Sequence, residues 1–294
     1  MQAVSRRAFY QANVGYVLLF ALAVFVLFDL TELDRLFSNL LYDPSTRVFP
    51  LEHSVLFEKI THKWARVIPN WTGEVAIIGS VLSFIWPRLA AHPHLRITKV
   101  LETIRIAPVL RFTTRYRRDF LFVVLAFALS TGVIHYLKSH TGVYCPVETT
   151  LYGGKEAHIE WFRNFTLWQD AGPGRCWPGG HASGGFSMLA LYFIARRYRW
   201  QHARKVLMGA LLLGFVFGTT RVLQGWHFMS HTLWSGIFVW LSTLVIALAV
   251  YGRERLSQPL NTSASRLVEN STASVPLTDL SHASLEHDTL RTLT

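Results

Sequence analysis

The chain has few charged side chains for its length, and this shortage limits the class of protein that it can encode. Only 16% of its 294 residues are Asp, Glu, Lys or Arg, whereas 51% are hydrophobic. Average soluble domains carry about 25% charged residues, so an ordinary soluble domain is disfavoured. The apolar residues also fall in long uncharged blocks, which is typical of an integral membrane protein.

Acidic residues are the scarcer of the two charged classes. There are 18 acidic and 29 basic residues, and the formal net charge is +11. The basic residues stand in short segments between the apolar blocks, as the positive-inside rule predicts for cytoplasmic loops. We therefore expect them to meet anionic lipid headgroups at a membrane, and we expect no nucleic-acid partner.

The apolar blocks predict an all-α protein, an integral membrane bundle of six helices. The expected spans cover residues 12–28, 71–91, 120–137, 178–195, 206–220 and 232–251. The most basic connecting segment, residues 92–119, indicates the cytoplasmic side, and this places both termini in the cytoplasm. Residues 1–251 are expected to form one membrane domain, and the polar residues 252–294 a disordered cytoplasmic tail.

Cysteine is nearly absent. The two cysteines, Cys145 and Cys176, both fall in the extracytoplasmic segment between the third and fourth expected spans. An oxidising compartment would let them pair. The sequence favours such a disulfide, with two unpaired thiols as the alternative.

Three polar stretches stand at the ends of expected spans, all on the outer face. They are residues 138–146 (KSHTGVYCP), 178–183 (PGGHAS) and 220–231 (TRVLQGWHFMSH). Ionisable groups at a membrane boundary are costly to hold and therefore mark functional sites. The spans are placed from apolar runs and the orientation from basic segments, without use of the polar stretches. That all three stretches lie on the same face therefore supports the topology independently.

These stretches contain the groups that cleavage of a phosphate ester requires. Positive charge and backbone N–H donors ahead of a helix can hold the phosphate, and they come from Lys138, Arg221, Gly179 and Gly180. His227 can attack phosphorus to form a phosphohistidine. His181 can protonate the departing oxygen.

His227 and His231 are four residues apart and share one face of a helix. Such a pair can also ligate a metal. No cysteine or carboxylate at ligand spacing accompanies the pair, so the sequence favours phosphate chemistry and predicts no metal and no cofactor.

Together the three stretches resemble the tripartite signature of the type 2 phosphatidic acid phosphatase (PAP2) family of the acid phosphatase/vanadium haloperoxidase superfamily. The first family motif is a Lys followed seven and eight residues later by Arg-Pro, and here Lys138 precedes Cys145-Pro146. The second motif is Pro-Ser-Gly-His, and here it is residues 178–181, PGGH. The third is Ser-Arg, five residues, His, three residues, Asp, and here it is Thr220-Arg221, His227 and His231.

The resemblance covers residues 120–251, and the N-terminal spans match only by topology. It implies that Lys138 and Arg221 bind phosphate, that His227 is the nucleophile and that His181 is the general acid, without a metal. His231 stands in place of an Asp that orients the nucleophilic His. A neutral His231 can still accept a hydrogen bond, whereas a protonated one cannot, so activity is expected to fall at acid pH.

The resemblance thus implies a membrane enzyme, a phosphoric ester hydrolase of lipids. We expect it to hydrolyse a phosphomonoester or pyrophosphate headgroup at the outer leaflet. We place it in a bacterial inner membrane, with its site facing the periplasm or exterior. The departures at Cys145, Gly179, Thr220 and His231 leave two alternatives open, a lipid phosphotransferase with the same site and a catalytically silent lipid-binding protein. A transporter is disfavoured, because no pair of broken helices in corresponding halves supports it.

Overall fold

The computed structural model describes residues 4–64, 66–92 and 96–261, and helices joined by loops are the regular secondary structure of this part of the chain. Within the described ranges there is no β-strand, and two isolated bridges, Asp43–Val48 and Thr149–Glu156, are the only extended pairings. The prediction of an all-α fold is therefore confirmed for this part of the chain.

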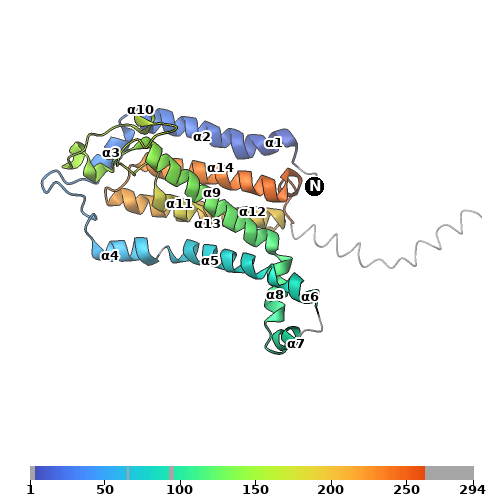
Figure 1. The fold of residues 1–294 in the computed structure, drawn as a ribbon. Coiled ribbons are helices and arrows are strands. Elements are labelled where there is room, and N and C mark those ends of the chain that lie inside the picture. Colours follow the sequence, from blue (N-terminus) through green and yellow to red (C-terminus); the bar gives the residue numbers. More distant parts are fainter. Residues whose placement is uncertain (1–3, 65, 93–95, 262–294) are drawn as a thin grey trace, which may run out of the picture.

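Five helical segments among the described residues are long and apolar enough to cross a membrane: Arg6–Asp29, Val67–Ala90, Arg117–Glu148, Ala203–Leu223 and Met229–Tyr251. The first joins α1 (Arg6–Tyr10) and α2 (Tyr16–Val24) through π-helical turns, and the second joins α5 (Val67–Leu82) and α6 (Ile85–Ala90). The other three contain α9 (Arg117–Thr141), α13 (Ala203–Leu223) and α14 (Met229–Tyr251). Each overlaps an expected apolar span, and they lie side by side in a bundle (Figure 1).

The apolar run at 178–195, expected to be the fourth span, forms two shorter helices. These are α11 (Gly180–Phe186) and α12 (Leu189–Arg197), with a break at Ser187 and Met188. The hydroxyl of Ser187 donates to the carbonyl of Gly184 at 2.7 Å, and such bonds compete with the helical ladder. Among the described residues, five of the six expected spans are therefore matched by a long apolar helix, and the fourth corresponds to this interrupted pair.

Close packing of α11 on α13 depends on glycine. A Cβ on Gly185 would lie 2.6 Å from Cα of Gly214, a contact that real side chains do not make. Small residues let membrane helices approach closely and pack well without a hydrophobic driving force. The tight contact with α13 therefore holds α11 in place just before the helix break.

Short helices connect the long ones at both ends of the bundle. At one end lie α3 (Leu33–Asn39), α4 (Val55–Glu58), the π-helix Lys59–Trp64 and α10 (Trp161–Asn164). At the other end α7 (Arg96–Thr103) and α8 (Ala107–Arg115) project from the bundle with α6 (Figure 1). Most basic residues of the described part of the chain lie at this second end.

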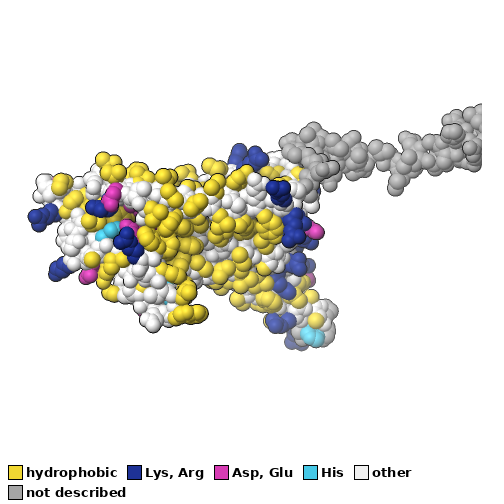
Figure 2. Space-filling view, turned by 90° about the horizontal axis from the view of Figure 1, so that it is seen from above, with side chains coloured by type: hydrophobic (Ala, Val, Ile, Leu, Met, Phe, Trp, Pro, Cys, Tyr) yellow, Lys and Arg dark blue, Asp and Glu magenta, His cyan; other side chains and the backbone are white. Residues whose placement is uncertain are grey.

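The surface carries a wide apolar belt between two polar ends (Figure 2). Large hydrophobic side chains on α2 and α5 are exposed there, among them Leu19 at 61% and Val81 at 61%. An apolar surface of this extent marks a membrane or partner contact, and with the five apolar helices it identifies a membrane protein.

A polar cluster joins three helices at the end where the chain begins. The carboxylate of Asp119 on α9 accepts hydrogen bonds from Tyr198 and Tyr251, each at 2.7 Å, and pairs with Arg197 at the end of α12. Asp119 is buried and Arg197 is half-buried. The cluster ties α9, α12 and α14 together by charge-assisted bonds.

The first residues of the segment expected to be a disordered tail are ordered against the bundle. Residues 253–256 form α15 (Arg253–Leu256), and Leu256 and Ser257 are each 2% exposed. Arg196 donates to the carbonyl oxygens of Leu256 and Gln258, and the N–H of Val4 donates to the carbonyl of Ser257. The prediction is therefore wrong for residues 252–261, and residues 262–294 lie outside the described ranges.

Candidate functional site

The three polar stretches meet at the end of the bundle opposite α1, α7 and α8 (Figure 1). Each site residue is held by a helix end: Lys138 in the last turn of α9, Gly179–His181 at the start of α11, Arg221 near the end of α13, His227 in the turn that follows, and His231 in the first turn of α14.

His227 lies at the centre of this group. Its side chain is 7% exposed, and its Nδ1 lies 3.3 Å from Nδ1 of His231. Two ring nitrogens at this distance share one proton, so one donates and the other accepts. If Nδ1 of His227 donates, its Nε2 carries a lone pair and is the nitrogen that can act as nucleophile.

The protonation of His227 depends on its burial and on its neighbours. Burial lowers the pKa of His227 well below its usual value, and positive charge on Lys138 and Arg221, or on His231 and His181 when they are protonated, lowers it further. His227 is therefore neutral near pH 7. A neutral ring beside the positive charges of Lys138 and Arg221 suits attack on an anionic group.

Lys138 reaches the start of α11 across a glycine. Its Nζ donates to the carbonyl of Arg175. A Cβ built on Gly180 would lie 3.2 Å from Cε of Lys138 and 3.8 Å from its Nζ. The absence of a side chain at Gly180 thus lets the ammonium lie against the backbone of α11.

Gly179 has a different role from the one expected. Its N–H donates to the carbonyl of His231 at 2.9 Å, and Ser235 Oγ donates to the carbonyls of both Gly179 and His231 at 2.8 Å. The prediction that the N–H of Gly179 binds phosphate is therefore wrong in this structure, because that donor is already used. Gly179 instead joins the second motif to the third.

Arg221 is held by two residues that the sequence patterns did not single out. Its Nη1 lies 3.1 Å from Oε2 of Glu58 and 2.9 Å from Oε1 of Gln224, and Nε2 of Gln224 also donates to Glu58 at 3.1 Å. Within the described part of the chain, Nε of Arg221 is buried and has no hydrogen-bond partner. A buried guanidinium donor without a partner can bind an anion. Gln224 stands three residues after Arg221, a spacing that signals contact on a helix, whereas Glu58 had no such signal.

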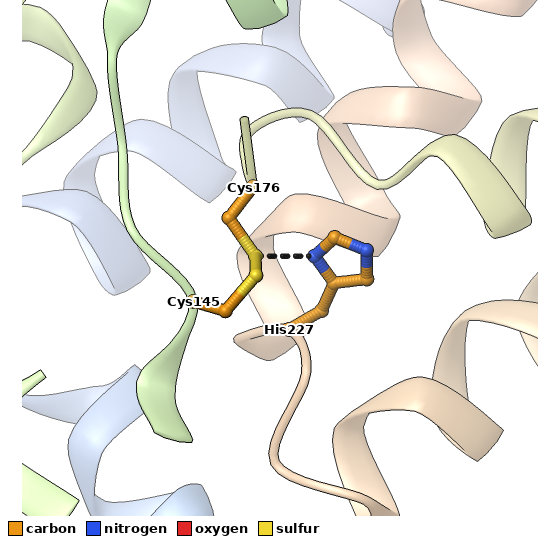
Figure 3. Close-up of side chains that lie close together, drawn as sticks. All are labelled: Cys145, Cys176 and His227. Atoms are coloured by element: carbon orange, nitrogen blue, oxygen red, sulfur yellow. Dashed lines mark hydrogen bonds between the residues drawn. A yellow bond between two sulfur atoms is a disulfide. The ribbon is translucent and has the colours of Figure 1, made fainter. Parts of the chain in front are cut away.

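A disulfide joins Cys145 and Cys176, whose Cα atoms are 5.1 Å apart. It ties the first motif to the second, and Sγ of Cys176 lies 3.1 Å from Nδ1 of His227 (Figure 3). These three residues are the one group among the described His, Cys, Asp and Glu residues whose donor atoms are close enough for a metal, all within 4.8 Å. Because both sulfur atoms are bonded to each other, neither is available as a thiolate ligand.

A cavity of about 550 Å³ opens beside His181. It lies between α5, α9 and α11, and its walls include Ile77, Phe127, Ser130 and Gly184. Ser130 is eight residues before Lys138 on α9, so the cavity reaches about 12 Å along the helix from the level of the ammonium, at 1.5 Å per residue. It therefore connects the histidine group with the depth of the apolar belt.

The fold and the site together define a helical membrane protein with a buried histidine group that suits an anionic ligand. Residues 119–255 match the family model of the PAP2 superfamily. The matched residues contain all three motifs, in agreement with the resemblance that those motifs indicated.

One curated relative is the lipid A 4'-phosphatase of Francisella tularensis subsp. novicida (strain U112). It is 27% identical to this chain over 147 residues, which are 49% of this chain and 64% of the relative. The match therefore spans less than two thirds of that protein. No solved structure matches the chain.

Proposed function

We propose that the protein is a lipid phosphatase that hydrolyses a phosphomonoester or pyrophosphate headgroup through a phosphohistidine. The convergence of Lys138, Arg221 and His181 on the neutral, buried His227 carries this proposal. The PAP2 superfamily match and the lipid A 4'-phosphatase relative support it.

The reaction begins with the phosphate held between cations. Lys138 and the unpartnered Nε of Arg221 neutralise its oxygens, which lowers the barrier by stabilising charge in the transition state. Nε2 of His227 attacks phosphorus while the Nδ1 proton is shared with His231. His181 gives a proton to the departing oxygen, so the lipid alcohol or lipid monophosphate leaves neutralised.

The second step regenerates the enzyme. His181, now without its proton, takes one from water, and the hydroxide attacks the phosphohistidine. Inorganic phosphate leaves and Nε2 of His227 regains its lone pair. The water must enter beside His181, and the 550 Å³ cavity reaches that residue.

The lipid part of the substrate is proposed to occupy the same cavity. Its walls combine the apolar side chains of Pro69, Ile77 and Phe127 with glycines and hydroxyls, and they also include Arg66, Asn70 and Glu74. The site lies at the end opposite the basic residues, which supports action on the outer leaflet. In a bacterial inner membrane the site would face the periplasm.

The test is phosphate release by the purified protein in detergent. The substrates are lipid A, phosphatidylglycerol phosphate and undecaprenyl pyrophosphate, each with wild type and His227→Ala. A matched control is His140→Ala, because His140 stacks on Tyr136 at 3.8 Å outside the site. Release that His227→Ala abolishes and His140→Ala preserves is the expected result.

Other outcomes favour the alternatives. Thin-layer analysis with an added acceptor lipid would reveal a phosphotransferase, since labelled phosphate would then appear in the acceptor instead of in solution. Binding of orthovanadate with no turnover in wild type would indicate a silent binding protein and would refute the phosphatase proposal.

A further inference from the structure

A second, smaller cavity adjoins His231. Its volume is about 50 Å³, and since a water needs about 10–15 Å³ of such space, it can hold a few waters. The titratable side chains that line it are mostly acidic and come from the segment around α3, the segment before α10 and α14: Asp29, Glu32, Asp34, Arg35, His158, Glu160 and His231. An excess of carboxylates therefore lies beside the residue that replaces the family's Asp.

Most of these carboxylates have a strong partner. Glu160 lies 3.0 Å from Nε2 of His158, and Glu32 lies 2.6 Å from Nη1 of Arg35. Asp29 accepts the indole N–H of Trp234 at 2.8 Å. Each of these three carboxylates therefore already has a partner other than His231.

Asp34 is placed differently. Its Oδ1 accepts the backbone N–H of Ser230 at 2.9 Å, which fixes the carboxylate at the start of α14, one residue from His231. No salt bridge to Asp34 is present among the described residues. Burial raises the pKa of Asp34 to about 6, and Glu160 adds to this effect. Carboxylates whose pKa is strongly shifted by burial are concentrated at functional sites, so Asp34 is a candidate for a functional role.

We propose that Asp34 is a positioning residue that acts through His231, supplying by way of cavity water the negative charge that position 231 lacks. This inference rests on the proposed function. Nδ1 of His231 accepts the Nδ1 proton of His227, and the N–H at Nε2 of His231 donates to water that donates to Asp34. Positive charge that develops on His227 during attack is then stabilised through the chain of hydrogen bonds.

The experiment is a double-mutant cycle of Asp34→Asn and His231→Asp, measured by phosphate release from the best lipid substrate. Asparagine keeps an acceptor for the N–H of Ser230, so the start of α14 is preserved. With His231 present, Asp34→Asn is expected to lower kcat about tenfold and to leave KM within about twofold. With His231→Asp the carboxylate contacts His227 directly, so adding Asp34→Asn is expected to change kcat by less than about twofold.

A purely structural role of Asp34 predicts an equal loss in both backgrounds, and that result would overturn the inference. Glu160→Gln is the matched control within the same cavity and is expected to have the smaller effect. If it exceeds Asp34→Asn, the acidic partner is Glu160 and the assignment is wrong.

The proposed function fails separately, when wild type and His227→Ala release equally little phosphate. The inference is then judged by ¹⁵N NMR of labelled histidines. Asp34→Asn is expected to shift the ring nitrogens of His231, with Glu160→Gln shifting them less. Unchanged resonances would refute the contact between Asp34 and His231.

Discussion

Filling the cavity beside His181 tests whether a lipid chain binds there, and Gly184 is the position for this change. Gly184 lines the cavity on α11, and a Cβ built on it meets no heavy atom within 4 Å. Gly184→Leu therefore enters open space without displacing the protein. It also replaces a helical glycine with a better helix former, so a loss of fold is not expected.

The size of the effect follows from the volume that the new side chain takes. A leucine side chain displaces about three methylenes of a bound chain, and each buried methylene is worth about 0.8 kcal/mol. The loss of about 2.4 kcal/mol corresponds to a KM about 50-fold higher. A short-chain, water-soluble phosphomonoester does not fill the cavity, so its KM is expected to stay within about twofold.

The assay is phosphate release from a long-chain and a short-chain substrate with the same headgroup. Gly209→Leu is the matched control, because Gly209 lies on the exposed surface of α13 and its Cβ also meets nothing within 4 Å. An equal loss for both substrates in Gly184→Leu would mean that His181 is disturbed, and an unchanged KM for the long chain would refute the cavity as the lipid site.

Three further predictions concern charges. Glu58→Gln removes a carboxylate that competes with phosphate for Arg221, so the inhibition constant of orthophosphate is expected to fall about two- to fivefold, and a rise would show that Glu58 positions Arg221 instead. Asp119→Ala removes the acceptor of the half-buried Arg197 and of the Tyr198 and Tyr251 hydroxyls, so thermal or denaturant unfolding in detergent is expected to show a loss of about 2–4 kcal/mol, and a change below about 1 kcal/mol would contradict the role given to this cluster. The pKa of Asp34 is raised to about 6, so the folded state penalises its ionisation, and Asp34 by itself is expected to lower the free energy of unfolding by up to about 3 kcal/mol as pH rises from about 4 to 6.5. Asp34→Asn should make the fall smaller by this amount, and identical pH profiles of thermal stability for wild type and variant would disprove the shift.

The spanning helices could be predicted from sequence because the membrane imposes a local rule. Backbone groups in hydrocarbon must be satisfied within the segment itself, and about 20 apolar residues cross the core. Five expected spans therefore correspond to helical segments with matching positions. The fourth expected span is interrupted. The hydroxyl of Ser187 donates to the carbonyl of Gly184 and competes with the helical hydrogen bonds, and Gly185 packs tightly against Gly214 of the neighbouring helix α13.

The candidate site divides in the same way. His227 and His231 are four residues apart, and helical geometry alone brings such residues together. Their contact could therefore be predicted from their spacing in the sequence. The N–H of Gly179 is used by the carbonyl of His231, a partner distant in sequence. Its role could not be read from the second motif alone.

The residues that the sequence by itself determined are thus those whose roles depend on composition and short spacing: the apolar spans, the basic end and the histidine pair. Tertiary structure alone decided which groups surround them. Glu58 contacts Arg221 from 163 residues away, and Asp34 contacts Ser230 from 196 residues away. Such pairings depend on how whole helices pack, because the energy of a charge contact depends on distance and burial and not on separation along the chain.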